Sequence, residues 1–194
     1  MLFRSGLTLF VIVNPLGAAV TAAYTVGMRL TMVPMVPGFG LGRASGALVG
    51  QNLGAGKPHR SEKCAWTVVR IYVWFMGAAA LFYFLCAPTV VGVFNDSPDV
   101  VNEGVRFLRI VVWGYVFIAV GIVLAKSLQG AGDTVGPMVI TGVSLFAVQL
   151  PLAWALSRWF GPVGVWVAIV VGAVTTSGLL ALRFRMGHWK HKEV

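Results

Sequence analysis

Side chains that could do nucleophilic, acid–base or metal chemistry are sparse in this sequence. The three histidines, His59, His188 and His191, lie in polar stretches, so no Ser–His–Asp or Cys–His set can be assembled around them. His188 and His191 are three residues apart, but no carboxylate or cysteine is arranged about them as a metal site would require. The pattern predicts a protein that is not an enzyme and holds no metal or other cofactor.

Two glycine-rich stretches look like nucleotide-binding loops but fail in their details. The run at 38–46 reads GFGLGRASG and lacks the third glycine of G-x-G-x-x-G in either register. The run at 53–58 reads LGAGKP, with Gln51 where a phosphate loop has its first glycine and Pro58 where it has Ser or Thr. Neither run follows a strand pattern, so nucleotide binding is not predicted.

All of the acidic residues fall outside the long apolar runs of the sequence. They are Glu62, Asp96, Asp99, Glu103, Asp133 and Glu193. Each is expected in a linker between helices or in the carboxyl-terminal tail. Ion-coupled transport normally needs an ionisable group within the membrane, and the apolar runs supply no carboxylate for that role.

Basic and polar residues do occur within the apolar runs. The cations are Arg29, Arg43, Arg70 and Lys126. Arg70 and Lys126 lie within two turns of the end of a run, from which their charged groups can reach the membrane surface. Burying arginine at mid-bilayer costs at least about 2.5–3.5 kcal/mol, so Arg29 and Arg43 must face a partner, a hydrated cavity or an interface. Arg29 is the better cavity candidate.

Four uncharged polar side chains also lie in these runs: Asn14, Tyr24, Tyr115 and Gln149. Hydrogen bonds between helices are the expected role of such residues, and contact with a transported substrate is the alternative.

The elements that must position these residues are membrane-spanning helices. The chain has 194 residues, of which 58% are hydrophobic and only 11% are charged, and its mean hydropathy is +0.84. Six apolar segments cover residues 7–16, 18–52, 64–94, 104–129, 137–160 and 165–184. Five are long enough to cross a bilayer, and they are apolar on all sides, so helices are predicted rather than the alternating strands of a barrel. The fold class is all-α, a polytopic transmembrane helix bundle.

Charge predicts the orientation of the bundle. The net charge is +9, and without aromatic–basic alternation in the polar segments it indicates cationic loops rather than nucleic acid. If the spans alternate, the linkers at 53–63 and 130–136 and the basic tail at 185–194 fall on one side, which should be cytoplasmic. The acidic linker at 95–103 falls on the other. Arg106, Arg109 and Arg158 lie near the outer ends, against this rule.

Small residues and prolines mark the second segment. Gly38, Gly42, Gly46 and Gly50 repeat at a spacing of four, which on a helix forms a stripe where a neighbouring backbone can approach closely. The stripe serves either tight packing or a sliding surface. Pro34 and Pro37 each remove a backbone donor, so a break is expected there, either a structural kink or a hinge at a transport site.

The first segment is too short to span a bilayer. Arg4, the apolar stretch and the Gly-Ala-Ala sequence after it imitate a signal peptide. The competing interpretation is the end of a helix whose beginning is missing.

Two loop motifs resemble those of MATE (multidrug and toxic compound extrusion) transporters. The run at 47–63, ALVGQNLGAGKPHRSEK, is similar to the end of their eighth helix and the loop after it. The run at 128–138, LQGAGDTVGPM, resembles the loop between their tenth and eleventh helices. The residues that carry these motifs are Gln51, Asn52, Gly54, Gly56, Gly130, Gly132, Asp133 and Thr134. The runs at 29–46 and 161–169 fit as well, so the similarity covers nearly the whole chain.

The resemblance implies one lobe of an exporter that has two six-helix lobes. Residues 1–184 would form the carboxyl-terminal transmembrane lobe, with five full spans and a truncated first helix. Such exporters sit in the bacterial inner membrane and expel small cationic or amphipathic compounds in exchange for H⁺ or Na⁺. Many have an acidic residue in the tenth helix, where this chain has Ile118. A coupling carboxylate is therefore expected in the missing amino-terminal lobe, and this chain is expected to be a fragment.

Three alternatives remain open at this point. A flippase for lipid-linked saccharides shares the fold and would favour a long cationic cleft lining, which the sequence does not clearly show. An assembly subunit that transports nothing would need no cleft at all. A membrane enzyme would need His, Asp or Glu clustered at a membrane boundary, and no such cluster is visible.

Overall fold

The computed structural model describes residues 9–191, and all regular structure in this part of the chain is helical. Residues 9–13 are helical and lead into a short turn at Asn14–Leu16. The main helices are α2 (Ala18–Gly54), α3 (Pro58–Gly92), α4 (Pro98–Val111), α5 (Tyr115–Gly130), α6 (Val135–Val143), α7 (Leu150–Phe160) and α8 (Pro162–Met186). A 3₁₀ turn at Val112–Gly114 joins α4 to α5, and the π-helical segment η3 (Ser144–Gln149) joins α6 to α7.

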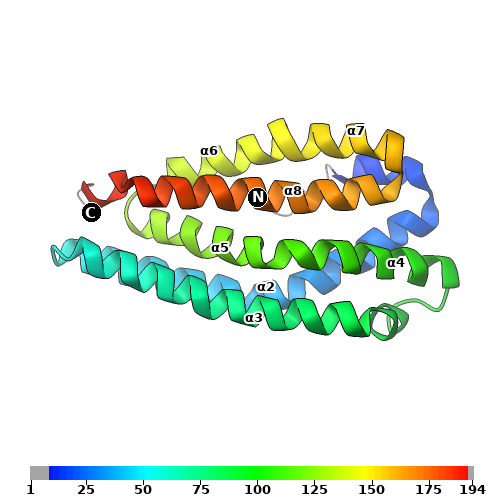
Figure 1. Ribbon diagram of the computed structural model, residues 1–194, viewed down its shortest axis with the longest axis horizontal. Helices are drawn as coiled ribbons and strands as arrows, with labels where there is room; N and C mark the ends of the chain where they lie inside the picture. The colour runs from blue at the N-terminus through cyan, green and yellow to red at the C-terminus, as the bar shows by residue number, and fades with distance from the viewer. Residues whose placement is uncertain (1–8, 192–194) are drawn as a thin grey trace.

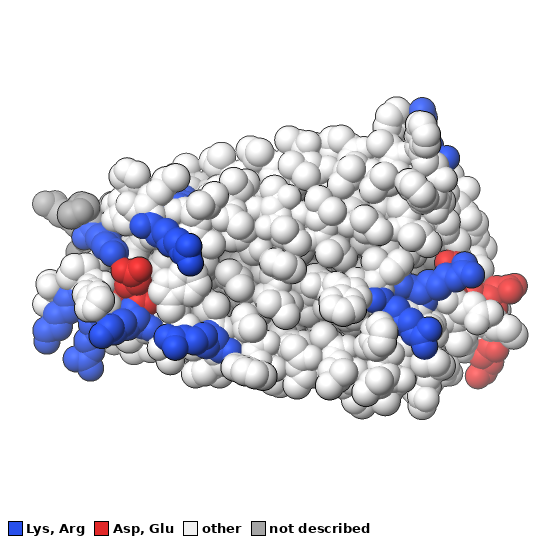
Figure 2. Space-filling view, viewed as in Figure 1, with Lys and Arg blue, Asp and Glu red and all other residues white. Residues whose placement is uncertain are grey.

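These helices form five spans long and apolar enough to cross a membrane, which confirms the expected number. They are Ala18–Gly54, Pro58–Gly92, Pro98–Gly130, Val135–Phe160 and Pro162–Met186. The spans lie side by side along the long axis of the molecule (Figure 1). On the face shown in Figure 2, charged side chains gather at the two ends and leave an apolar belt between them, as a bilayer requires.

The two ends of the bundle differ in the segments they contain. The α2–α3 turn, the α5–α6 turn and the carboxyl terminus lie at one end, and the α3–α4 and α7–α8 turns lie at the other (Figure 1). We call the first of these the tail end. Two ion pairs tie its segments together, Arg183 with Asp133 at 2.6 Å and Lys190 with Glu62 at 2.7 Å. The expected grouping of the two linkers with the tail on one side thus agrees with the arrangement of the spans.

Two helices begin earlier than the apolar runs indicated. α3 starts at Pro58 rather than at residue 64, and α4 starts at Pro98 rather than at residue 104. Proline is favoured at the first helical position because its missing N–H would be unpaired there anyway, and the polar turn that follows projects beyond the apolar belt. The expectation that every carboxylate lies in a linker or the tail is therefore wrong for Glu62 on α3 and for Asp99 and Glu103 on α4.

The core of the bundle is centred on α5. This helix packs against α2, α3 and α8. In the most apolar stretch of each span, 56% of the residues are buried for the α4–α5 span and 11% for the α6–α7 span. The last helix continues through Met186, past the expected boundary at residue 184. Beyond it Trp189 is buried and donates from Nε1 to the carbonyl oxygen of Phe184 at 2.7 Å, so the beginning of the tail is packed rather than wholly solvated.

Candidate functional site

The two prolines of α2 do not break the helix, contrary to expectation. α2 continues from Ala18 to Gly54 with Pro34 and Pro37 inside it, and Figure 1 shows it curving along its length. Pro34 has no N–H, so the carbonyl of Leu30 loses its usual donor one turn away. The Tyr83 hydroxyl of α3 donates to that carbonyl at 3.1 Å. A neighbouring helix thus satisfies the backbone group that the proline frees, as membrane burial demands.

A buried polar cluster surrounds this point in α2. The Tyr72 hydroxyl donates to the carbonyl of Pro34 at 3.1 Å. The Tyr115 hydroxyl donates to Thr31 Oγ1 at 3.4 Å, and the rings of Tyr83 and Tyr115 meet edge to face at 6.2 Å. These tyrosines come from α3 and α5. We call Tyr72, Tyr83, Tyr115 and Thr31 the tyrosine cluster, which ties the proline region of α2 to its two neighbours.

The five candidate cavity residues are not brought together. Tyr115 is fully buried in the tyrosine cluster, and Tyr24 is buried with its ring stacked on Trp166 at 5.7 Å. Gln149 lies in η3, where its side chain packs closely over Gly172 of α8. Asn14 and Arg29 are exposed. The structure therefore places Tyr24, Tyr115 and Gln149 between packed helices, and it leaves Arg29 on an outer face of α2.

The glycine stripe of α2 lies against two other helices. A methyl group at Gly38 would collide with the Tyr72 ring, and one at Gly42 would touch the Lys126 side chain. At Gly46 and Gly50 it would come within 2.7 Å of the backbone carbonyl oxygens of Lys126 and Gly130 respectively. α2 and α5 therefore meet backbone to backbone.

A side-chain hydrogen bond adds to this contact. Ser45 and Ser127 are fully buried with their hydroxyl oxygens 2.7 Å apart. Ser127 donates to the carbonyl of Val123, so Ser45 is the donor across the interface. We call the contact between residues 42–50 of α2 and residues 126–130 of α5 the α2–α5 seam.

The first loop motif forms a tight turn at the tail end. Asn52 Nδ2 donates to the carbonyl of Leu48 at 2.7 Å, while Gln51 and Gly54 are exposed. Gly56 adopts a φ of +69°, a left-handed conformation that favours glycine. This turn reverses the chain between α2 and α3.

The second loop motif anchors the end of α8. Gly132 has a φ of +79°, and Thr134 beside it is exposed. Asp133 is buried, and both of its oxygens accept hydrogen bonds from Arg183, at 2.6 and 3.1 Å. A methyl group at Gly136 would collide with this guanidinium, so the glycine makes room for the ion pair. The sequence motif contains Asp133 but gives no sign of its partner fifty residues away.

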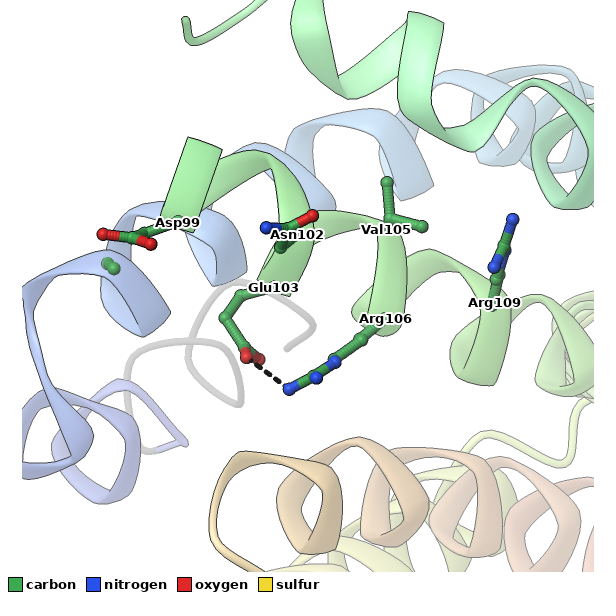
Figure 3. A pocket seen from close by; sticks show the side chains of 7 residues that line it. Asp99, Asn102, Glu103, Val105, Arg106 and Arg109 are labelled. Carbon is green, nitrogen blue, oxygen red and sulfur yellow. Dashed lines mark hydrogen bonds and ion pairs between the residues drawn. The ribbon is translucent and has the colours of Figure 1, made fainter. Parts of the chain in front are cut away.

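A cavity of about 520 Å³ opens at the end opposite the tail. It is lined by Ala19 of α2 and by Asp99, Asn102, Glu103, Val105, Arg106 and Arg109 of α4. Figure 3 shows Glu103 and Arg106 joined by an ion pair of 2.8 Å. The second carboxylate oxygen of Glu103 is buried and has no hydrogen-bond partner among residues 9–191. The cavity therefore holds mixed charges, and sequence reasoning had placed all of its acidic groups in a linker.

Comparison with known proteins gives the family. The MatE family profile matches residues 2–155, most of the chain, and the chain belongs to that family. The probable multidrug resistance protein NorM of Thermotoga maritima is 25% identical over 99% of this chain and 42% of its own length. NorM of Mesorhizobium japonicum is 29% identical over 84% of this chain and 36% of its own length.

Solved structures agree on the fold. A crystal structure of a MATE protein in the straight conformation superposes with a TM-score of 0.88 at 22% identity, over 97% of this chain and 43% of that one. The Vibrio cholerae MATE transporter VcmN in its bent form gives a TM-score of 0.88 at 18% identity, over 94% of this chain and 42% of that one. The chain spans about two-fifths of the length of these relatives, which fits one lobe of a two-lobed transporter.

Proposed function

We propose that this chain is the carboxyl-terminal lobe of a multidrug exporter that works by H⁺- or Na⁺-coupled antiport. The observation that carries the proposal is the pairing of a family match over most of the chain with coverage of about two-fifths of each relative. The missing amino-terminal lobe would complete the central cleft and supply a coupling carboxylate. The substrates are small cationic or amphipathic compounds.

The membrane orientation belongs to the same proposal. The α2–α3 turn and the start of α3 hold Lys57, Arg60 and Lys63, and the end of the chain holds Arg185 and Lys190; all of these segments lie at the tail end. Figure 2 shows Lys and Arg side chains gathered at this end. Cytoplasmic loops carry an excess of Lys and Arg. The tail end is therefore cytoplasmic, in the bacterial inner membrane.

The exposed stripe of α2 is the surface that would line the cleft. Arg29, Val33, Val36 and Arg43 recur at helical spacing, and all four are exposed. An arginine facing lipid near mid-bilayer would cost at least about 2.5–3.5 kcal/mol. Facing a hydrated cleft removes that cost, so this stripe is assigned to the cleft rather than to lipid.

Complementation by the missing lobe tests the proposal. Cells that lack their own exporters would carry this chain alone, a relative's amino-terminal lobe alone, or both, and efflux of the cationic dye ethidium would be measured. Only the pair should export the dye. Export by this chain alone would contradict the half-transporter assignment. If the pair assembles without export, the alternative of a non-transporting assembly subunit is favoured.

Cysteine labelling tests the cleft surface separately. Val36→Cys would be introduced after Cys64 and Cys86 are replaced by serine, with Phe146→Cys on the exposed face of η3 as the matched control. In membranes containing both lobes, a water-soluble maleimide should label residue 36 and not residue 146. Equal protection of both positions would show that the α2 stripe faces lipid.

A further inference from the structure

The tail end has cations that no carboxylate in the described chain neutralises. Its acidic groups within residues 9–191 are Glu62 and Asp133, and each is already paired, with Lys190 and with Arg183. Arg70 and Arg185 form no ion pair with any described residue, and both are exposed. This end therefore has positive charge available for an anionic partner.

Two of these cations meet at one tryptophan. Arg185 of α8 lies over the ring of Trp66 on α3, 5.7 Å from its centroid. Arg70 donates from Nε to the backbone carbonyl of Trp66 at 3.3 Å. Two guanidinium groups from two helices thus contact the same residue, Arg185 at its ring and Arg70 at its backbone carbonyl, and each keeps other N–H donors to offer.

The indole of Trp66 packs against other aromatic rings. Trp66 meets Phe184 edge to face at 6.0 Å, and Phe184 stacks on Trp189 at 4.7 Å. Nearby, the Lys190–Glu62 ion pair joins the short turn after α8, His188–His191, to α3. The position of Trp66 is therefore fixed before any ligand arrives.

The depth of this cluster matches the lipid headgroup region. Trp66 lies eight residues after the start of α3, or about 12 Å along the helix, and Arg185 lies in the last turn of α8. Tryptophan is enriched at the membrane–water interface. Below the cations, toward the apolar belt, are the exposed side chains of Trp74 on α3 and Leu182 on α8.

We propose that Trp66, Arg70 and Arg185 form a binding site for the phosphate of an anionic phospholipid. The guanidinium groups hydrogen-bond to the phosphate oxygens, a geometry for which arginine is well suited. The acyl chains lie along Trp74 and Leu182. Basic sites between transmembrane helices on the cytoplasmic side bind anionic headgroups in this way. Free phosphate offers the same oxygens but lacks the acyl chains, so the apolar surface below selects the lipid.

Thermal unfolding with added lipid tests the site. The full chain in a neutral detergent would be titrated with phosphatidylglycerol, phosphatidylcholine or inorganic phosphate. Phosphatidylglycerol should raise the unfolding temperature, and the other two should not. Each neutralised cation should weaken the apparent lipid affinity about fivefold, and the Arg70→Gln, Arg185→Gln double variant about thirtyfold.

Arg109→Gln is the matched control. Arg109 makes the same kind of contact, 5.9 Å from the ring of Phe84, but at the opposite end of the bundle, and its loss should leave the phosphatidylglycerol response unchanged. An unchanged response in the double variant would overturn the proposal, as would equal stabilisation by phosphatidylcholine. Equal stabilisation by inorganic phosphate would show that the site binds anions without selecting the lipid, and it would overturn the proposed role of the acyl chains. Should the double variant fail to fold, native mass spectrometry of Arg185→Gln would count retained lipid, and a full count would likewise reject the site.

Discussion

The α2–α5 seam and the α6–α7 span are both apolar, yet they are built in opposite ways. At the seam, Gly46 and Gly130 bring two backbones together, and Ser45 bonds to Ser127. In the most apolar stretch of the α6–α7 span only 11% of the residues are buried, and Gly142 has open space around it. Mean hydropathy does not explain the difference, because α2, on the seam, has the lower value of 1.2 and is 44% buried, whereas the α6–α7 span has 1.8 and is 11% buried. Small residues in the right places, rather than hydrophobicity, decide which helix is packed at the centre.

The largest expected effect is at the centre of the seam. A methyl group at Gly130 would collide with backbone atoms of Gly46, which cannot rotate away as a side chain could. Gly130→Leu should therefore destabilise the chain by about 3 kcal/mol or more, seen as a lower unfolding temperature in detergent. Gly142→Leu on α6 is the matched control and should change stability little. An equal fall in unfolding temperature in the two variants would show that the seam is no more tightly packed than the peripheral span.

The attachment of the peripheral span to the bundle comes next in size. Asp133 precedes α6, is buried, and accepts hydrogen bonds from Nε and Nη2 of Arg183. Asp133→Asn keeps the shape but removes the charge, and it should cost about 2 kcal/mol because charge-assisted hydrogen bonds are the stronger kind. Unfolding temperature is the measurement. The Glu103–Arg106 pair at the other end serves as control, since its arginine is exposed and Arg106→Gln should cost about 0–1 kcal/mol. A larger loss for Arg106→Gln would contradict the argument.

The proline region of α2 gives a smaller, paired prediction. Tyr83→Phe removes the donor to the Leu30 carbonyl, for which Pro34 supplies no N–H. This should cost about 1 kcal/mol. Tyr72→Phe should cost less, because in a helix the Pro34 carbonyl also has the N–H of Gly38 as its donor. Comparing the two unfolding temperatures tests this account, and a greater loss for Tyr72→Phe would refute it.

The sequence predicted the outline of the fold better than its contacts. Runs of apolar residues were enough to count five spans, and alternation of spans was enough to group the tail with two linkers. Helix starts were missed because the polar turns after Pro58 and Pro98 carry no apolar signal. The donor to the Leu30 carbonyl, which Pro34 leaves without its usual N–H, was also missed, because Tyr83 is 53 positions further along the chain and no local pattern links the two.

The candidate site shows the same limit more sharply. The glycine spacing of α2 indicated a face of close approach, and the structure places α3 and α5 against it. The charge of Arg29 set it apart from the tyrosines, but nothing in the residue types separated Tyr24 and Tyr115, which are buried, from Asn14, which is exposed. The face of a long apolar helix is set by its neighbours in the bundle. Sequence alone could not tell a cleft from a packed interface.

The smallest expected effect lies in the peripheral span and completes the comparison. Ser144 in η3 is buried, and its hydroxyl has no hydrogen-bond partner among the described residues. Removing an unsatisfied polar atom relieves a desolvation cost, so Ser144→Ala should leave the unfolding temperature unchanged or slightly raised. Ser45→Ala at the seam removes a satisfied hydroxyl and should lower it, by about 0.6 kcal/mol on the scale of interhelical bonds in membranes. If the unfolding temperature falls for Ser45→Ala and rises for Ser144→Ala, the serine hydroxyl stabilises the seam but not η3. If it falls equally in both variants, η3 depends on its serine as well.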